Sequence, residues 1–118
     1  MHSIKVEAGF SSAHNLRAYK GKCEDLHGHN WKVEAVVRSE KLDSLGMVMD
    51  FKDIKIHLNA LLEELDHKYL NELEPFKKIN PTSENLARYI YERLKKNIPA
   101  LSLITVWENN TSAATYEE

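Results

Sequence analysis

The sequence has little of several features that mark large classes of proteins. Cys23 is the only cysteine among 118 residues, so no internal disulfide can form and a reducing compartment is expected. The formal net charge is only −2, which argues against nucleic-acid binding because that function needs a basic face. No stretch approaches the roughly 20 apolar residues of a membrane span, and the start of the chain lacks the apolar run of a signal peptide. We therefore expect a cytoplasmic protein that binds neither nucleic acid nor membranes.

What is present is typical of a globular protein. Hydrophobic residues make up 42% of the chain and charged residues 29%, and neither repeats nor low-complexity segments occur. A chain of this length predicts one domain over residues 1–118 with a modest core. Association with copies of itself would bury more apolar surface.

The first half of the chain predicts two strands and a helix. Residues 3–10 alternate polar and apolar side chains, which predicts a half-buried strand, and a second strand is expected over about 29–38. The stretch 11–28 has no clear period and is interpreted as a long loop, a kind of segment that is often functional. Turn residues at 43–46 are expected to close this hairpin.

The second half predicts two helices and two strands. Leucine and isoleucine recur at helical spacing over 51–65, and a second helix is expected to begin within 80–83 and to end at Asn97. Strands are expected over 101–108 and 112–118, joined by a tight turn. The order ββααββ favours an α+β fold in which a four-stranded antiparallel sheet carries both helices on one face. A partner subunit is the expected cover for the other face.

Two histidines precede the second strand in a pattern that suits a metal. His27 and His29 are two residues apart, so their side chains can share one side of a strand, and imidazole nitrogen is a good ligand for Zn²⁺. His14 follows the first strand and could return beside them as a third ligand. An HxH pair alone is a weak signal, and His14 could instead only hydrogen-bond within its loop.

Three further positions carry chemically useful groups. Cys23 could be a nucleophile or base, a fourth zinc ligand, or only a small half-buried hydrophobe. Asp66 and His67 could form a positioned proton carrier, although adjacent residues do not usually pair and Asp66 could serve a helix end. Glu108 ends an apolar strand, where its carboxylate could accept two N–H bonds from a flat heterocycle or could simply be solvated.

Taken together, these segments resemble the pyruvoyl-tetrahydropterin synthase family, and within it the carboxy-tetrahydropterin branch of queuosine precursor synthesis. The resemblance covers essentially the whole chain. It rests on FSSAH at 10–14, CEDLHGH at 23–29, LDHKYLN at 65–71, NPTSEN at 80–85 and VWENNTSAATY at 106–116.

The resemblance implies a tunnelling fold and a pterin substrate. In this fold three subunits close their sheets into a barrel, and two such trimers stack into a homohexamer with active sites between subunits. The implied reaction converts dihydroneopterin triphosphate to 6-carboxy-tetrahydropterin, with zinc as Lewis acid and release of acetaldehyde and triphosphate. The implied site residues are His14, His27 and His29 for zinc, Cys23, Asp66 and His67 for proton transfer, and Glu108, Thr82 and Ser83 for the pterin.

Other products and a non-enzymatic role remain open. The spacing from Cys23 to His27 resembles the carboxy branch, whereas Glu24 resembles a glutamate with which some relatives cleave the side chain differently. Asn109 stands where many relatives have threonine. Two alternatives keep the enzyme but change the product, to a pyruvoyl pterin or to a pterin with its side chain cleaved elsewhere. A third is a structural zinc module in which the cysteine is the fourth ligand. A basic loop could hold the triphosphate or only be solvated, and its cations are Arg17, Lys20 and Lys22.

Overall fold

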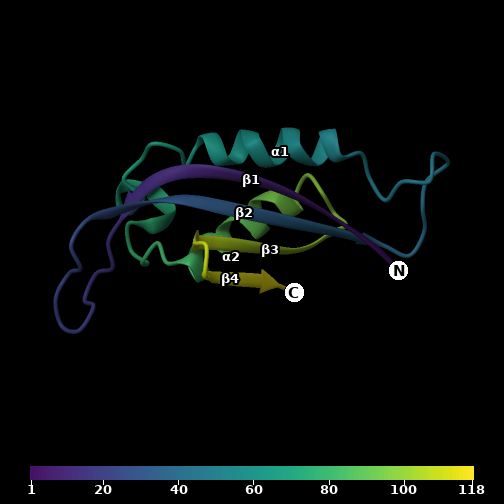
Figure 1. Ribbon diagram of the computed structural model, residues 1–118. Helices are drawn as coiled ribbons and strands as arrows, with labels where there is room; N and C mark the ends of the chain where they lie inside the picture. The colour runs from purple at the N-terminus through teal and green to yellow at the C-terminus, as the bar shows by residue number, and fades with distance from the viewer.

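The computed structural model describes all residues, 1–118, and confirms the ββααββ order (Figure 1). Two long strands form a curved hairpin, two helices follow with short 3₁₀ turns between them, and a second hairpin ends the chain. The elements are β1 (His2–His14), β2 (His27–Ser39), α1 (Phe51–Glu63), η1 (Leu70–Glu72), η2 (Glu74–Phe76), α2 (Ser83–Lys95), β3 (Leu101–Asn109) and β4 (Ser112–Glu117).

The four strands form one antiparallel sheet in the order β1-β2-β3-β4, so β1 and β4 are its edges. Because side chains alternate between the two faces of a strand, one face collects Phe10, Trp31, Val33, Ile104 and Val106, all buried. Both helices cover this face. The predicted α+β fold with its four-stranded sheet is confirmed.

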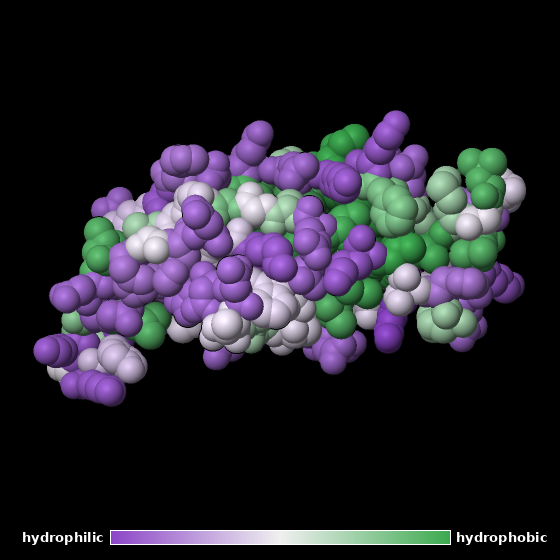
Figure 2. Space-filling view, viewed as in Figure 1, coloured by the Kyte–Doolittle hydropathy of each residue, from purple (hydrophilic) through white to green (hydrophobic).

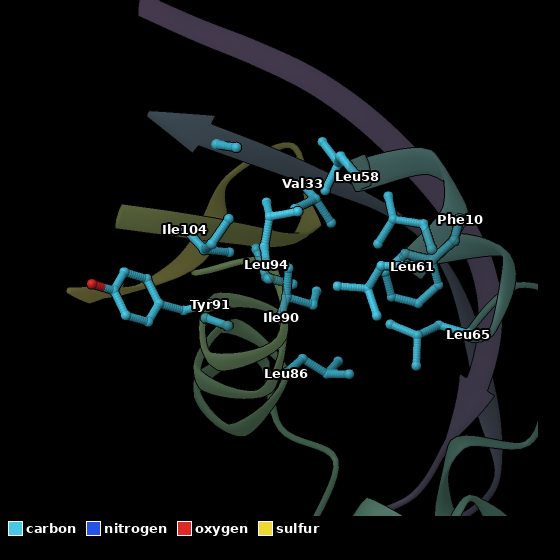
Figure 3. Close-up of a cluster of buried hydrophobic side chains, with 14 of the residues drawn as sticks. Phe10, Val33, Leu58, Leu61, Leu65, Leu86, Ile90, Tyr91, Leu94 and Ile104 are labelled. Carbon is cyan, nitrogen blue, oxygen red and sulfur yellow. The ribbon is translucent and has the colours of Figure 1, made fainter. Parts of the chain in front are cut away.

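The core lies between that face and the two helices (Figure 3). Leu58 and Leu61 of α1 and Ile90 and Leu94 of α2 point toward the sheet, and each is at most 4% exposed. Thr82 caps α2, where its side chain accepts a hydrogen bond from the amide of Asn85. The segment before this cap contacts β1 through the carbonyl of Pro81, which lies 2.7 Å from His14 Nδ1, and it borders the candidate site described below.

The first hairpin is longer than predicted. The expected loop over 11–28 is wrong at both ends, because residues 11–14 pair with residues 27–30 as strand. The period of two continues through this segment, but its inward-facing residues are Ser12 and His14 in place of apolar ones, which hid the pattern. The true connection is the protruding loop 15–26 (Figure 1).

Other predicted boundaries shift by smaller amounts. The residues 43–46 do turn, with Gly46 at φ 82°, but the turn lies between β2 and α1, so it does not close the first hairpin. The first helix ends at Glu63 and the second spans 83–95, because the amides beyond each end bond to carbonyls three residues back, as Glu64 does to Leu61 and Asn97 to Leu94. Tight pairing across residues 109–112 confirms the final hairpin.

The surface is mostly hydrophilic in the view of Figure 2, with apolar side chains gathered at the end near the β2–α1 connection. Leu42, Leu45 and Phe51 are exposed there. No helix has the length and apolar character needed to cross a membrane.

Candidate metal and pterin site

The β1–β2 hairpin brings three histidines together beyond the end of the core. His14 pairs directly with His27, and His29 lies one pair further along the strand, opposite Ser12. All three side chains continue the helix-covered face, because they fall on the same alternation as Phe10 and Trp31. Their ring centroids are 4.6 Å apart for 14–27, 4.8 Å for 27–29 and 5.2 Å for 14–29. The structure therefore gathers the three histidines that the sequence singled out.

A carboxylate from β3 completes the group. Glu108 shares the inward face with Ile104 and Val106, and its Oε1 lies 3.1 Å from His29 Nε2 and 3.4 Å from His14 Nε2. One ligand atom from each of the four residues lies within 4.8 Å of the others. Glu108 was expected at a strand end, but its contact with the histidines was not predicted from the sequence. That contact depends on the pairing register of β2 and β3, which a single sequence does not display.

Hydrogen bonds on the outer side of the rings orient two of the histidines. His14 Nδ1 lies 2.7 Å from the carbonyl oxygen of Pro81, and His27 Nδ1 lies 2.9 Å from that of Asp25. A carbonyl only accepts hydrogen bonds, so each Nδ1 carries the proton and the lone pair is left on Nε2. This arrangement is typical of histidines that bind metals.

The inner nitrogens have no hydrogen-bond partner. Nε2 of His14 and Nε2 of His29 are both buried, and neither forms a hydrogen bond despite the nearby carboxylate of Glu108. Burial lowers the pKa of His29, with Glu108 opposing the shift, so its imidazole is favoured in the neutral form that metals bind. Unsatisfied buried polar atoms are uncommon and call for an explanation, which a bound cation would supply.

Two of the separations between ligand atoms are close to those of a tetrahedral zinc site. In a tetrahedral site with bonds of about 2.0–2.2 Å, neighbouring ligand atoms lie about 3.3–3.5 Å apart. The 3.1 and 3.4 Å separations around Glu108 Oε1 are close to that spacing. Three imidazoles and one carboxylate are also ligands that zinc accepts.

Asp66 and His67 pair with each other, although adjacent residues seldom do. His67 Nδ1 lies 2.9 Å from Asp66 Oδ2, and the other carboxylate oxygen accepts the amide N–H of Ser11 at 2.8 Å. A left-handed backbone at His67, with φ 55°, makes the contact possible. The Ser11 amide, followed by His67, lowers the pKa of Asp66. The pair lies outside the four-residue group, beside the outer edge of β1, where the His67 amide donates to the Ser11 carbonyl and the Ala13 amide donates to that of Lys68. The His67 side chain is 82% exposed.

Cys23 is exposed in the loop 15–26 and is not part of the four-residue group. The alternative in which its sulfur is the fourth zinc ligand therefore finds no support in this arrangement. The next residue, Glu24, lies near a histidine: its Oε1 is 3.7 Å from His27 Nδ1 and accepts the amide N–H of Leu16 at 3.2 Å.

A cavity of about 290 Å³ opens beside the histidines. It joins Thr82 and Ser83, which the resemblance assigned to the pterin, to two carboxylates near the metal group. Its lining residues are His14, Leu16, Tyr19, Glu24, Thr82, Ser83, Glu84 and Glu108.

Arg17 has a structural position in this part of the molecule. Its guanidinium donates to the carbonyl oxygens of Asn71, Phe76 and Ile79, which ties the loop to the segment before α2. Lys20 and Lys22 are exposed on the loop. Of the three predicted cations, the arginine is therefore bound to backbone carbonyls, and the two lysines are exposed, with Lys20 over the ring of Tyr19.

Comparison with known proteins agrees with this geometry. The model of the family described as 6-pyruvoyl tetrahydropterin synthase matches residues 3–118. A 6-carboxy-5,6,7,8-tetrahydropterin synthase from Synechocystis is 40% identical, with 98% of this chain and 93% of that protein covered. A dihydroneopterin monophosphate aldolase from Pyrococcus furiosus is 39% identical, with 91% and 90% covered.

A solved structure supports the same assignment. The 6-pyruvoyl tetrahydropterin synthase of Caenorhabditis elegans superposes with a TM-score of 0.88 at 30% identity, over 99% of this chain and 95% of that one. Both the sequence and the fold match from end to end. The chain belongs to the 6-pyruvoyl tetrahydropterin synthase family.

Proposed function

We propose that this protein is a zinc-dependent pterin synthase that converts 7,8-dihydroneopterin triphosphate to 6-carboxy-5,6,7,8-tetrahydropterin, a lyase reaction that releases acetaldehyde and triphosphate. The observation that carries the proposal is the convergence of His14, His27 and His29 beside a cavity that Glu108 also lines. The 40% identity to a carboxy-tetrahydropterin synthase favours this product. The same relationship supports a role in queuosine precursor synthesis.

The three histidines would hold Zn²⁺, which when bound would act as a Lewis acid toward the substrate side-chain hydroxyls. Glu108 accepts N–H groups of the pterin ring, and Thr82 and Ser83 line the wall of the same cavity. Pterin recognition and metal binding thus meet at one end of the sheet.

Proton transfer is assigned to Cys23 and to the Asp66–His67 pair. Asp66 holds the His67 ring through Nδ1, so Nε2 is free to give or take a proton. Cys23 as thiolate would remove or return a proton from a side-chain carbon. These residues lie outside the four-residue group within one chain, which agrees with an active site that neighbouring subunits complete.

An assembly of six chains follows from this reading. The sheet ends at β1 and β4, where only residues 11–13 of β1 are covered, by residues 67–69, and one of its faces has no helices. Three sheets can therefore join edge to edge into a barrel, and two barrels can stack. Light scattering on purified protein is expected to give the mass of six 13.6 kDa chains. A monomer at all concentrations would contradict the shared site. The cytoplasmic location stays a prediction from the sequence.

A second candidate function is side-chain cleavage of the aldolase type. Glu24 favours it, because its carboxylate lines the cavity and lies 3.7 Å from His27 whereas Cys23 is exposed. The 39% identity to a dihydroneopterin monophosphate aldolase points the same way.

Product analysis separates the candidates. Zinc-loaded protein is incubated with dihydroneopterin triphosphate, and pterins and aldehydes are identified by mass spectrometry. Carboxy-tetrahydropterin with acetaldehyde is the expected result. A pyruvoyl or hydroxymethyl pterin would transfer the assignment to another branch of the family, and no conversion with zinc bound would favour a binding module.

A further inference from the structure

We infer that Glu108 is a reversible fourth metal ligand, which occupies the substrate position of the metal in the free protein and leaves it when the pterin ring binds. The inference rests on the proposed function and adds a coupling between pterin recognition and metal binding. Binding of the pterin ring would then free the fourth coordination position of the metal for the substrate side chain.

The position of Oε1 carries the first step. It lies 3.1 Å from His29 Nε2 and 3.4 Å from His14 Nε2, yet it forms a hydrogen bond with neither nitrogen. Atoms at that spacing without hydrogen-bond geometry are arranged as ligands of one ion are, about 3.3–3.5 Å apart. A carboxylate that served only as a hydrogen-bond acceptor would instead align with an N–H donor.

The tautomers carry the second step. Because Nδ1 of His14 faces the carbonyl of Pro81, its Nε2 presents a lone pair toward Glu108. A lone pair and a carboxylate oxygen repel each other unless a cation lies between them. The position of Glu108 opposite His14 Nε2 is therefore favourable when a cation lies between the two atoms.

The chemistry of the carboxylate carries the third step. Accepting two parallel N–H groups of a pterin turns both carboxylate oxygens toward the edge of the ring, so Oε1 moves away from the position between His14 and His29 in which it would face the metal. The Glu108 side chain is 32% exposed and lies one residue before the end of β3, where the β3–β4 register shifts, so a rotation toward the cavity does not disturb the core. A catalytic zinc needs one exchangeable position, and this movement supplies it.

The test uses the Co²⁺-loaded full-length protein, whose visible absorption reports the ligands and the geometry of the ion. Glu108→Gln keeps the size of the side chain but removes its charge. Glu84→Gln is the matched control, because Glu84 lines the same cavity but is not in the metal group. Circular dichroism of the metal-free variants verifies that both fold.

We expect Glu108→Gln to change the Co²⁺ spectrum and to weaken Zn²⁺ binding by about tenfold or more in chelator competition, with Glu84→Gln close to wild type. Dihydroneopterin triphosphate should then shift the wild-type spectrum as the carboxylate leaves. Equal affinities and spectra for the two variants would overturn the inference even if the wild type turned the substrate over. A spectrum that depends on Glu108 but does not respond to the pterin would instead refute the exchange and, without turnover, the proposed function.

Discussion

Zinc binding should stabilise the fold by an amount that depends on all three histidines. A ligand that binds only the folded state stabilises it by RT ln(1 + [L]/Kd), about 2.7 kcal/mol when free zinc is a hundred times Kd. At about 2.1 cal/mol/K of unfolding entropy per residue, a chain of 118 residues has roughly 250 cal/mol/K in total. Zinc at that concentration should therefore raise Tm by about 11 °C.

The perturbation is His29→Ala, with His57→Ala as the matched control. His57 lies on α1, outside the metal group. The assay compares Tm with zinc and with chelator at one fixed protein concentration for each variant, so that any change in the metal-free fold cancels. We expect His29→Ala to lose most of the zinc-dependent increment and His57→Ala to keep it. An increment of the same size in both variants would refute the assignment of the ligands.

Three further predictions test the packing, the charge pair and the catalytic assignment. Gly9→Ala should cost about 1–3 kcal/mol in urea unfolding, because its Cβ would lie 2.9 Å from a backbone oxygen of β2. Gly28→Ala, whose Cβ would have its nearest neighbour at 3.7 Å, should change stability by under about 1 kcal/mol, and equal losses would contradict the packing. The pKa of Asp66 is lowered, so its ionised form stabilises the fold above the ordinary value of 3.8 and this contribution is lost as the pH falls through the lower folded-state value. The stability difference between wild type and Asp66→Asn should accordingly be steady near neutral pH and shrink in acid, and a difference that persists at the lowest pH would count against the pair. Cys23→Ala should keep zinc but lose turnover by about 10²–10⁴-fold, whereas Glu24→Gln should keep most of it; the reverse order would favour the aldolase reading.

The fold was largely predictable from the sequence, because most of its elements carry an apolar period. The predictions failed where polar residues of the candidate site stand at positions that the apolar period would fill. Ser12 and His14 interrupt the apolar side of β1, so the strand appeared to stop at residue 10 when it continues to residue 14. The same substitution of polar for apolar residues is what places the candidate site at the end of the core.

The site was predictable in its histidines and less so in its other members. His14, His27 and His29 follow from a hairpin in which the first and second strands pair, which sequence order suggests. The contact of Glu108 depends on the β2–β3 register, and the Asp66–His67 pair depends on a left-handed residue. Neither the strand register nor the left-handed backbone can be recognised from the spacing or periodicity of the residues.

X-ray absorption at the zinc edge of the purified, zinc-loaded protein tests the central claim most directly, because zinc bonds to sulfur are about 2.3 Å and those to nitrogen or oxygen about 2.0–2.2 Å. The account predicts a first shell of three imidazole nitrogens and one oxygen, with no sulfur. A Zn–S distance in that shell, or fewer than three imidazoles, would contradict it.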